Sequence, residues 1–164
     1  MNYPFMPEGL FPVSAIKPTT TNGALVGDYI SVKNAEMVWV VLHFTQAVGH
    51  ATAITLERAT AVAPTGSVAI ANAVPIWYGN VTTASTQLTA QTAAVSYAIL
   101  VGVTGDIYVI FEVDPASLGT TYDCLTVKTA ASAQVTNFVE ATYWIKPKYQ
   151  SKVASMTATE FIVD

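Results

Sequence analysis

Charged residues are scarce in this sequence. Lysine, arginine, aspartate and glutamate make up 11% of its 164 residues, against roughly 25% in an average soluble domain. The hydrophobic fraction is 52%, and the mean hydropathy is +0.43. Disordered chains and coiled coils both need many charged or polar residues, so the composition excludes those two classes. The length suits one domain, with room for an arm at either end.

Positive charge is the scarcer of the two signs. Seven Lys and Arg face eleven Asp and Glu, which gives a net charge of −4. A nucleic-acid-binding surface needs clustered cations that displace counterions from the phosphates. The densest basic cluster, Lys146, Lys148 and Lys152, is interpreted as the solvated end of a strand. We therefore expect no direct binding of nucleic acid.

Cysteine and long hydrophobic runs are nearly absent. The single cysteine, Cys124, cannot form a disulfide within the chain, so packing must stabilise the fold, which fits a reducing cytoplasm. The longest uninterrupted apolar run, residues 37–42, is far shorter than the ~20 residues that span a bilayer. The N-terminus has neither the basic start nor the apolar stretch of a signal peptide. We expect cytoplasmic synthesis and no membrane association.

Motifs of catalysis are missing too. No nucleophile elbow and no phosphate-binding glycine loop occurs in the sequence. His43 and His50 lack further ligands at converging spacing, so we interpret them as a partnered strand histidine and a loop histidine. Asp106, Glu112 and Asp114 could pair as an acid and a base, but Asp114 suits a helix cap and structural roles are favoured. We expect that the chain is not an enzyme and that it needs no cofactor or metal.

The sequence does contain regularly spaced β signals. Short β-branched and aromatic runs recur about every 10–15 residues, and no stretch shows a convincing helical period. This pattern predicts an all-β fold, a β-sandwich or jelly-roll-like single domain. Residues 37–44 suit a central strand buried on both faces, and residues 114–119 suit one helical turn. The candidate strands cover residues 28–32, 37–44, 51–59, 74–80, 88–92, 97–101, 107–113, 124–129, 138–145 and 160–163.

The first 27 residues read as a separate, irregular arm. Several prolines remove backbone donors there, yet the segment carries large apolar side chains. The arm either packs on its own domain or contacts a neighbouring subunit, because termini are loose unless they are tied down. The sequence therefore predicts an N-terminal arm over residues 1–27 and a β-sandwich over residues 28–164. The candidate partner-binding residues are Tyr3, Phe5, Leu10 and Phe11.

Aromatic side chains fall within the candidate strands, including Trp39, Trp77 and Trp144. Such rings usually fill a core or a subunit interface. An exposed set of them would instead suit stacking on sugars. The first interpretation is favoured here. The second leaves a carbohydrate- or receptor-binding module of a fibre or adhesin as the alternative function.

Low surface charge has a functional implication of its own. A free soluble monomer generally relies on charge for colloidal stability. A surface of Thr, Ser, Ala and Asn loses its water at lower cost than one of Lys and Glu, which are depleted at interface cores. The composition therefore favours a protein that is packed against copies of itself or on a larger lattice. The alternative is a soluble domain with a Thr-rich surface.

Five stretches of the sequence resemble small virion proteins of tailed bacteriophages. They are YISVKNAEMVWVVLHFTQA (29–47), AITLERATAV (53–62), FEVDPASLG (111–119), YDCLTV (122–127) and YWIKPKY (143–149). The resemblance implies a head decoration, or cement, protein with a β-sandwich or jelly-roll fold. It also implies a homo-oligomer, most often a trimer, that binds the major capsid protein on the outer surface of the capsid after synthesis in the bacterial cytoplasm. The resemblance implies no residue-level site.

Overall fold

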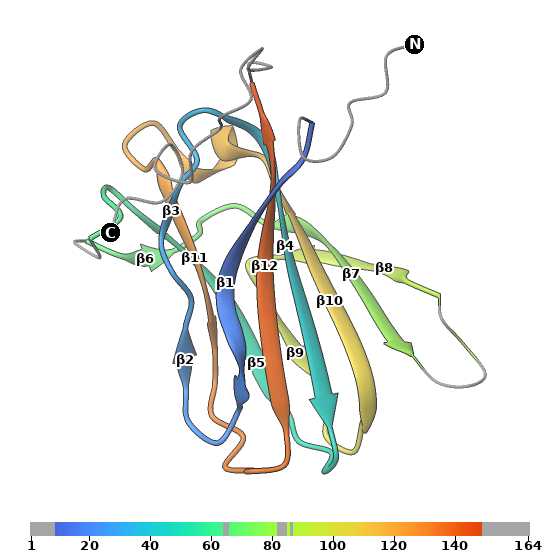
Figure 1. The fold of residues 1–164 in the computed structure, drawn as a ribbon. Coiled ribbons are helices and arrows are strands. Elements are labelled where there is room, and N and C mark those ends of the chain that lie inside the picture. Colours follow the sequence, from blue (N-terminus) through green and yellow to red (C-terminus); the bar gives the residue numbers. More distant parts are fainter. Residues whose placement is uncertain (1–8, 64–65, 82–84, 86, 149–164) are drawn as a thin grey trace.

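The computed structural model describes residues 9–63, 66–81, 85 and 87–148, and these form two antiparallel sheets packed face to face (Figure 1). The predicted all-β fold is confirmed. Among the described residues, no helix is long and apolar enough to cross a membrane. The expected strand over residues 160–163 lies outside the described part of the chain.

We call the two layers the front sheet and the rear sheet, after their places in Figure 1. In spatial order, the front sheet contains β1 (Phe11–Thr20), β12 (Phe138–Pro147), β4 (Ala35–Gln46), β10 (Gly105–Val113), β7 (Val74–Val81) and β8 (Thr89–Ala94). The rear sheet contains β2 (Leu25–Val26), β11 (Cys124–Thr129), β5 (Thr52–Ala59) and β6 (Val68–Ala69), with β3 (Ile30–Ser31) also paired to β11 and β9 (Ser96–Ile99) to β5.

The strand pairing is that of a jelly roll. The first strand pairs with the last, β1 with β12, and the next pairs lie within it: β2 and β3 with β11, β4 with β10, and β5 with β9. A hairpin of strands rolled on itself produces this nested order, and jelly rolls are built from two such Greek keys. Strand β6 and the hairpin of β7 and β8 extend the edges of the two sheets.

Strand β4 shows how the sequence builds the core. Its alternate residues Val38, Val40, Leu42 and Phe44 are fully buried between the sheets, whereas the residues between them are only half-buried. Alternation follows from the two-residue period of a strand. The prediction that residues 37–44 are buried on both faces is therefore wrong. The run is apolar throughout, but nothing among the described residues covers its outer side.

The N-terminal segment differs from the predicted arm. Residues 11–20 form strand β1, which pairs with β12 from Phe11 to Thr20 across two register shifts. An edge strand tolerates proline because only one of its sides needs backbone donors. Val13, Ala15 and Ile16 are buried in the core. The expectation that this stretch is irregular is wrong, and the sandwich includes residues well before residue 28.

The predicted helical turn is present as a single 3-10 turn, Pro115–Leu118. The Asp114 carboxylate accepts a hydrogen bond from the Ala116 N–H at 2.9 Å, and Pro115 occupies the first position of the turn. Gly119 ends it with φ of 95°, a conformation that favours glycine. Asp114 therefore acts as a cap.

Tyr143 ties the two sheets together. It lies in β12 of the front sheet and is fully buried. Its hydroxyl donates to the Asp28 carbonyl oxygen at 3.0 Å and accepts from the Val127 N–H, in β11 of the rear sheet, at 3.2 Å. Burial raises the pKa of this phenol well above its usual value, so it stays protonated at all physiological pH values.

Candidate functional site

The candidate site is the outer face of the front sheet, the side turned away from the rear sheet. Strand register places its residues in rows across the sheet. In one row, Trp39 is opposite Trp144 on one side and Glu112 on the other. In the next row, Ile110 is opposite both Val41 and Trp77. Directly opposite side chains contact one another, so these rows form a continuous surface.

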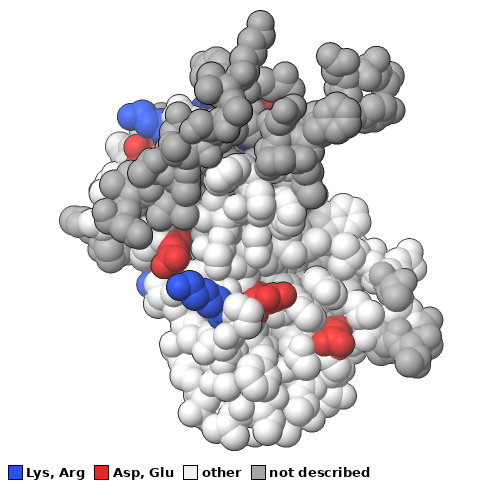
Figure 2. All heavy atoms as spheres, in the orientation of Figure 1, with Lys and Arg blue, Asp and Glu red and all other residues white. Residues whose placement is uncertain are grey.

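Part of this outer face is an apolar cluster, and Glu112, Asp106 and Glu140 lie on the same face. Trp77 is 36% exposed, and Trp39, Val41, Ile110 and Trp144 are half-buried. Figure 2 views the molecule from this side and shows few charged side chains on the described surface. Contiguous apolar patches of this kind mark contact sites in soluble proteins. The sequence prediction treated Val41 as core. The sequence gives no signal that it faces outward, because Val40, Val41 and Leu42 are all apolar.

His43 lies on the same outer face, between two carboxylates. Its Nδ1 is 3.3 Å from Glu140 Oε1, and its Nε2 is 3.3 Å from Asp106 Oδ1. The imidazole stacks on the Tyr108 ring with centroids 4.5 Å apart. The Thr45 hydroxyl donates to Asp106 at 2.9 Å. The expectation of a partnered strand histidine is confirmed, and these contacts join polar side chains of three strands, β4, β10 and β12.

The acid–base candidates do not meet. Asp106 is the second residue of β10 and pairs with His43, whereas Glu112 is next to the last residue of that strand. Asp114 is used by the 3-10 turn. Within the described part of the chain, no group of three or more His, Cys, Asp and Glu side chains could hold a metal ion.

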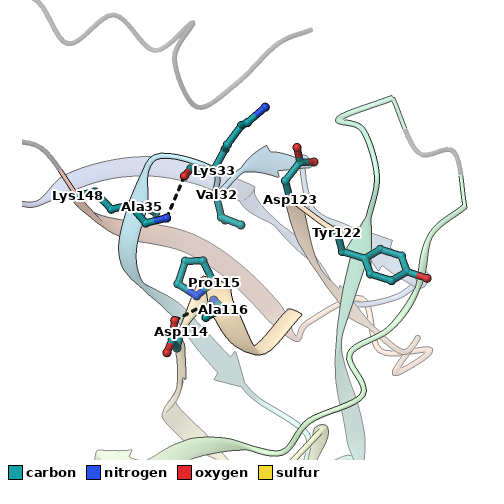
Figure 3. Close-up of a pocket in the computed structure, with 9 residues that line it drawn as sticks. All are labelled: Val32, Lys33, Ala35, Asp114, Pro115, Ala116, Tyr122, Asp123 and Lys148. Carbon is teal, nitrogen blue, oxygen red and sulfur yellow. Dashed lines mark hydrogen bonds between the residues drawn. The ribbon is translucent and has the colours of Figure 1, made fainter. Parts of the chain in front are cut away.

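A pocket of about 200 Å³ opens beside the 3-10 turn (Figure 3). Its polar groups serve the fold: Lys148 Nζ donates to the Lys33 carbonyl oxygen at 3.2 Å, and Asp114 caps the turn. In Figure 3 the Lys33 and Tyr122 side chains extend away from the pocket rather than into it. The lining therefore presents no converging reactive groups. Its residues are Val32, Lys33, Ala35, Asp114, Pro115, Ala116, Tyr122, Asp123 and Lys148.

Cys124 is buried at the start of β11. Burial raises the pKa of its thiol to about 12, and the neighbouring Asp123 carboxylate, 3.4 Å from the sulfur, adds to this shift. The thiolate is the reactive form of cysteine. This side chain therefore stays a protonated, packed thiol near neutral pH.

Of the four predicted partner-binding residues, Leu10 and Phe11 lie in the described part of the chain. Phe11 begins β1 and packs against the core of its own domain. Leu10, just before it, is half-buried. Tyr3 and Phe5 lie outside the described residues. For Phe11, the structure agrees with the interpretation that the segment packs on its own domain.

Solved structures include a neighbour with a similar fold. No family model and no curated protein matches the sequence. The fold is similar to that of YomS. The crystal structure of this SPBc2 prophage-derived protein matches with a TM-score of 0.47 and 10% sequence identity, over 83% of this chain and 91% of that chain. A likeness at this level carries no functional conclusion, and the proposals below rest on the residues of this chain.

Proposed function

We propose that this chain is a structural virion protein of a tailed phage, a capsid decoration protein that binds the assembled head and stabilises it. The proposal includes a homo-oligomer, with a trimer favoured, that contacts the major capsid protein on the outer surface of the head. The observation that supports it best is the apolar outer face of the front sheet around Trp39, Val41 and Ile110. The phage-like stretches of the sequence point in the same direction.

A face of this composition is suited to being covered. Two tryptophans, Trp39 and Trp144, stand side by side there, and Ile110 lies between Val41 and Trp77. Burying apolar surface contributes about 25 cal/mol per Å². A subunit that covers the apolar part of the face must leave Glu112, Asp106 and Glu140 at its rim or supply partners for them. We therefore assign the contact between copies of the chain to this face.

Stabilisation of the head follows from linkage. A protein that binds the assembled shell and not its separate subunits lowers the free energy of the shell by RT ln(1 + [L]/Kd) at each site. An oligomer that contacts several shell subunits at once adds avidity without requiring tight single contacts. No catalytic group takes part in such a role.

Ile110→Glu is expected to weaken self-association by about tenfold or more, because it places a charge at the centre of the covered face. Sedimentation equilibrium of the purified chain measures this, and circular dichroism checks that the variant is folded. Val68→Glu is the matched control, because Val68 is exposed in β6 and stands opposite Arg58. A wild-type chain that is monomeric at all concentrations would contradict the assignment of this face.

Co-sedimentation with heads tests the role itself. Heads purified from a phage mutant that lacks this protein are mixed with the purified chain, and we expect it to pellet with them and to delay their thermal disassembly. A chain lacking residues 1–9 tests the predicted contribution of Tyr3 and Phe5 in the same assay. Strand β1 stays intact in that variant. Failure of the full chain to pellet would refute the decoration role.

The tryptophans on the outer face of the front sheet support a second candidate, a carbohydrate- or receptor-binding module. Trp39 and Trp144 are adjacent on an outward face, which is the arrangement that sugar stacking uses. Quenching of tryptophan fluorescence by acrylamide separates the two functions. In the native oligomer, a decoration protein should shield Trp39 and Trp144, whereas a sugar-binding face should leave them open to the quencher.

A further inference from the structure

A second surface of different character lies at one end of the sandwich. Four connections meet there, and we call this surface the loop end. They join β1 to β2, β4 to β5, β9 to β10, and β11 to β12, at the lower end of Figure 1. Strand register places them together: Gln46 is opposite Gly105, and Thr52 is opposite Ile99. The connections span residues 21–24, 47–51, 100–104 and 130–137.

The loop end has no Asp, Glu, Lys or Arg in any of these four connections. The first charges appear inside the strands, at Asp106 in β10 and Lys128 in β11. The opposite end of the sandwich, beside the 3-10 turn, carries Lys33, Asp114 and Lys148. Figure 2 shows the same division, because its lower end is free of coloured side chains. Charge is thus segregated along the long axis of the molecule.

Large apolar side chains project from this uncharged end. The two most exposed among those described, Leu100 and Val101, are 71% and 77% exposed. Val48, Val135 and Phe138 at the same end are exposed as well. Exposed valines and leucines scattered singly need no explanation, but a group of them gathered on one end does. No residue in the described part of the chain covers them.

Buried polar groups hold three of the connections together. The Asn137 amide donates to the Val48 carbonyl oxygen at 2.7 Å and accepts from the Val48 N–H at 3.0 Å. Thr21 and Ser132 join their hydroxyls at 2.6 Å, and the Ser132 N–H donates to the Thr21 carbonyl oxygen at 2.7 Å. Thr21, Ser132 and Asn137 are all buried. Satisfied buried networks of this kind make a structure rigid.

A backbone contact attaches the fourth connection. A Cβ atom placed on Gly49 would lie 2.6 Å from the backbone of Gly102, a distance that side chains do not allow. Glycine at position 49 therefore lets the β4–β5 and β9–β10 connections touch directly. Through this contact, Leu100 and Val101 are fixed relative to Val48. The loop end is a pre-organised surface.

We propose that the loop end is the surface by which the oligomer docks on the head, against an uncharged apolar patch of a shell protein. This inference rests on the proposed decoration role. A charged patch is disfavoured because its ions would lose water without gaining a counter-charge. A membrane is disfavoured because no Lys or Arg stands at this end to meet anionic headgroups. Rigid loops bind with little loss of conformational freedom.

The proposal also assigns separate tasks to the two apolar surfaces. The outer face of the front sheet runs along the strands, whereas the loop end lies across their tips. In a cyclic oligomer, rotation about one axis leaves every copy of the loop end at the same height. Several small patches then meet a repetitive lattice together, and avidity makes weak single contacts sufficient.

Val101→Glu and Val101→Lys test the docking surface, with heads that lack the protein as the probe. Both variants are expected to lower affinity in co-sedimentation by about tenfold or more, since either charge would be buried against an apolar patch. The control for Val101→Glu is Val68→Glu, which adds the same negative charge at an exposed site opposite Arg58. This control should bind as the wild type does. Wild-type binding should persist in 1 M NaCl.

Each other outcome overturns the proposal in a distinguishable way. If the wild type does not pellet with heads, the decoration role and the docking surface both fail. If it pellets and both Val101 variants pellet equally well, only the docking surface fails. A gain of affinity with one sign of charge would indicate a charged partner patch. Flotation of the wild type, but not of Val101→Glu, with phosphatidylcholine vesicles would indicate a lipid surface instead.

Discussion

Tyr143→Ala is expected to lower the free energy of unfolding by about 3–5 kcal/mol, the range for removing a large buried aromatic side chain. The side chain is fully buried in β12, and its hydroxyl bridges to Val127 in β11 of the rear sheet and to Asp28 between β2 and β3. Tyr143→Phe isolates the bridge, because it keeps the ring and leaves the Val127 N–H and the Asp28 carbonyl without this partner. That change should cost about 1–3 kcal/mol.

Urea unfolding followed by circular dichroism measures both variants against a matched control. Tyr108→Phe removes a hydroxyl from a half-buried tyrosine on the outer face of the front sheet and keeps its stacking on His43. It should change stability by less than about 0.5 kcal/mol, as surface changes usually do. A Tyr143→Phe variant as stable as Tyr108→Phe would show that the hydroxyl bridge does not contribute.

The second large effect is expected at Asn137. Its amide satisfies both the N–H and the carbonyl of Val48, so Asn137→Ala leaves two backbone groups without their partner. At about 1–3 kcal/mol for each unsatisfied group, and with Val48 partly open to water, the loss of stability should be about 2–4 kcal/mol. If the loop end docks on the head, binding should weaken as well, because the β4–β5 connection is no longer held in place.

Gln134→Ala is the control for this prediction. Gln134 lies in the same connection and is half-buried, and its backbone contacts survive the change. Thermal and urea unfolding should place this variant within about 0.5 kcal/mol of the wild type. An equal effect of the two variants would mean that general loosening of the connection, and not the Asn137 clamp, accounts for any loss.

Much of the fold could be predicted because its signals are local. Strands β10, β11 and β12 fall where the runs of β-branched and aromatic residues predict them, and Asp114 caps the turn that it was expected to cap. These features depend on residues within a few positions of each other. Strand β1 was missed because its prolines are a local signal against regular structure, whereas its pairing with β12 comes from the far end of the chain.

The candidate site was only partly predictable. The apolar character of residues 37–44 is evident in the sequence, but which alternate residues face outward depends on what the second sheet covers. Trp39, Trp77 and Trp144 were identified as core or interface, and their rows appear only when strand register is known. Nothing in the sequence around the candidate arm residues indicated what their side chains contact. The structure packs Phe11 within its own domain.

Composition and periodicity alone established an all-β chain with few charges and short strands, since each of these properties is carried by neighbouring residues. The tertiary structure decided the nested jelly-roll order, because that order depends on contacts such as Thr21 with Ser132, which are 111 residues apart. It also decided which surface of the molecule lacks charge. The uncharged stretches are scattered along the sequence, and only folding gathers them at one end of the sandwich, with Leu100 and Val101 at its surface.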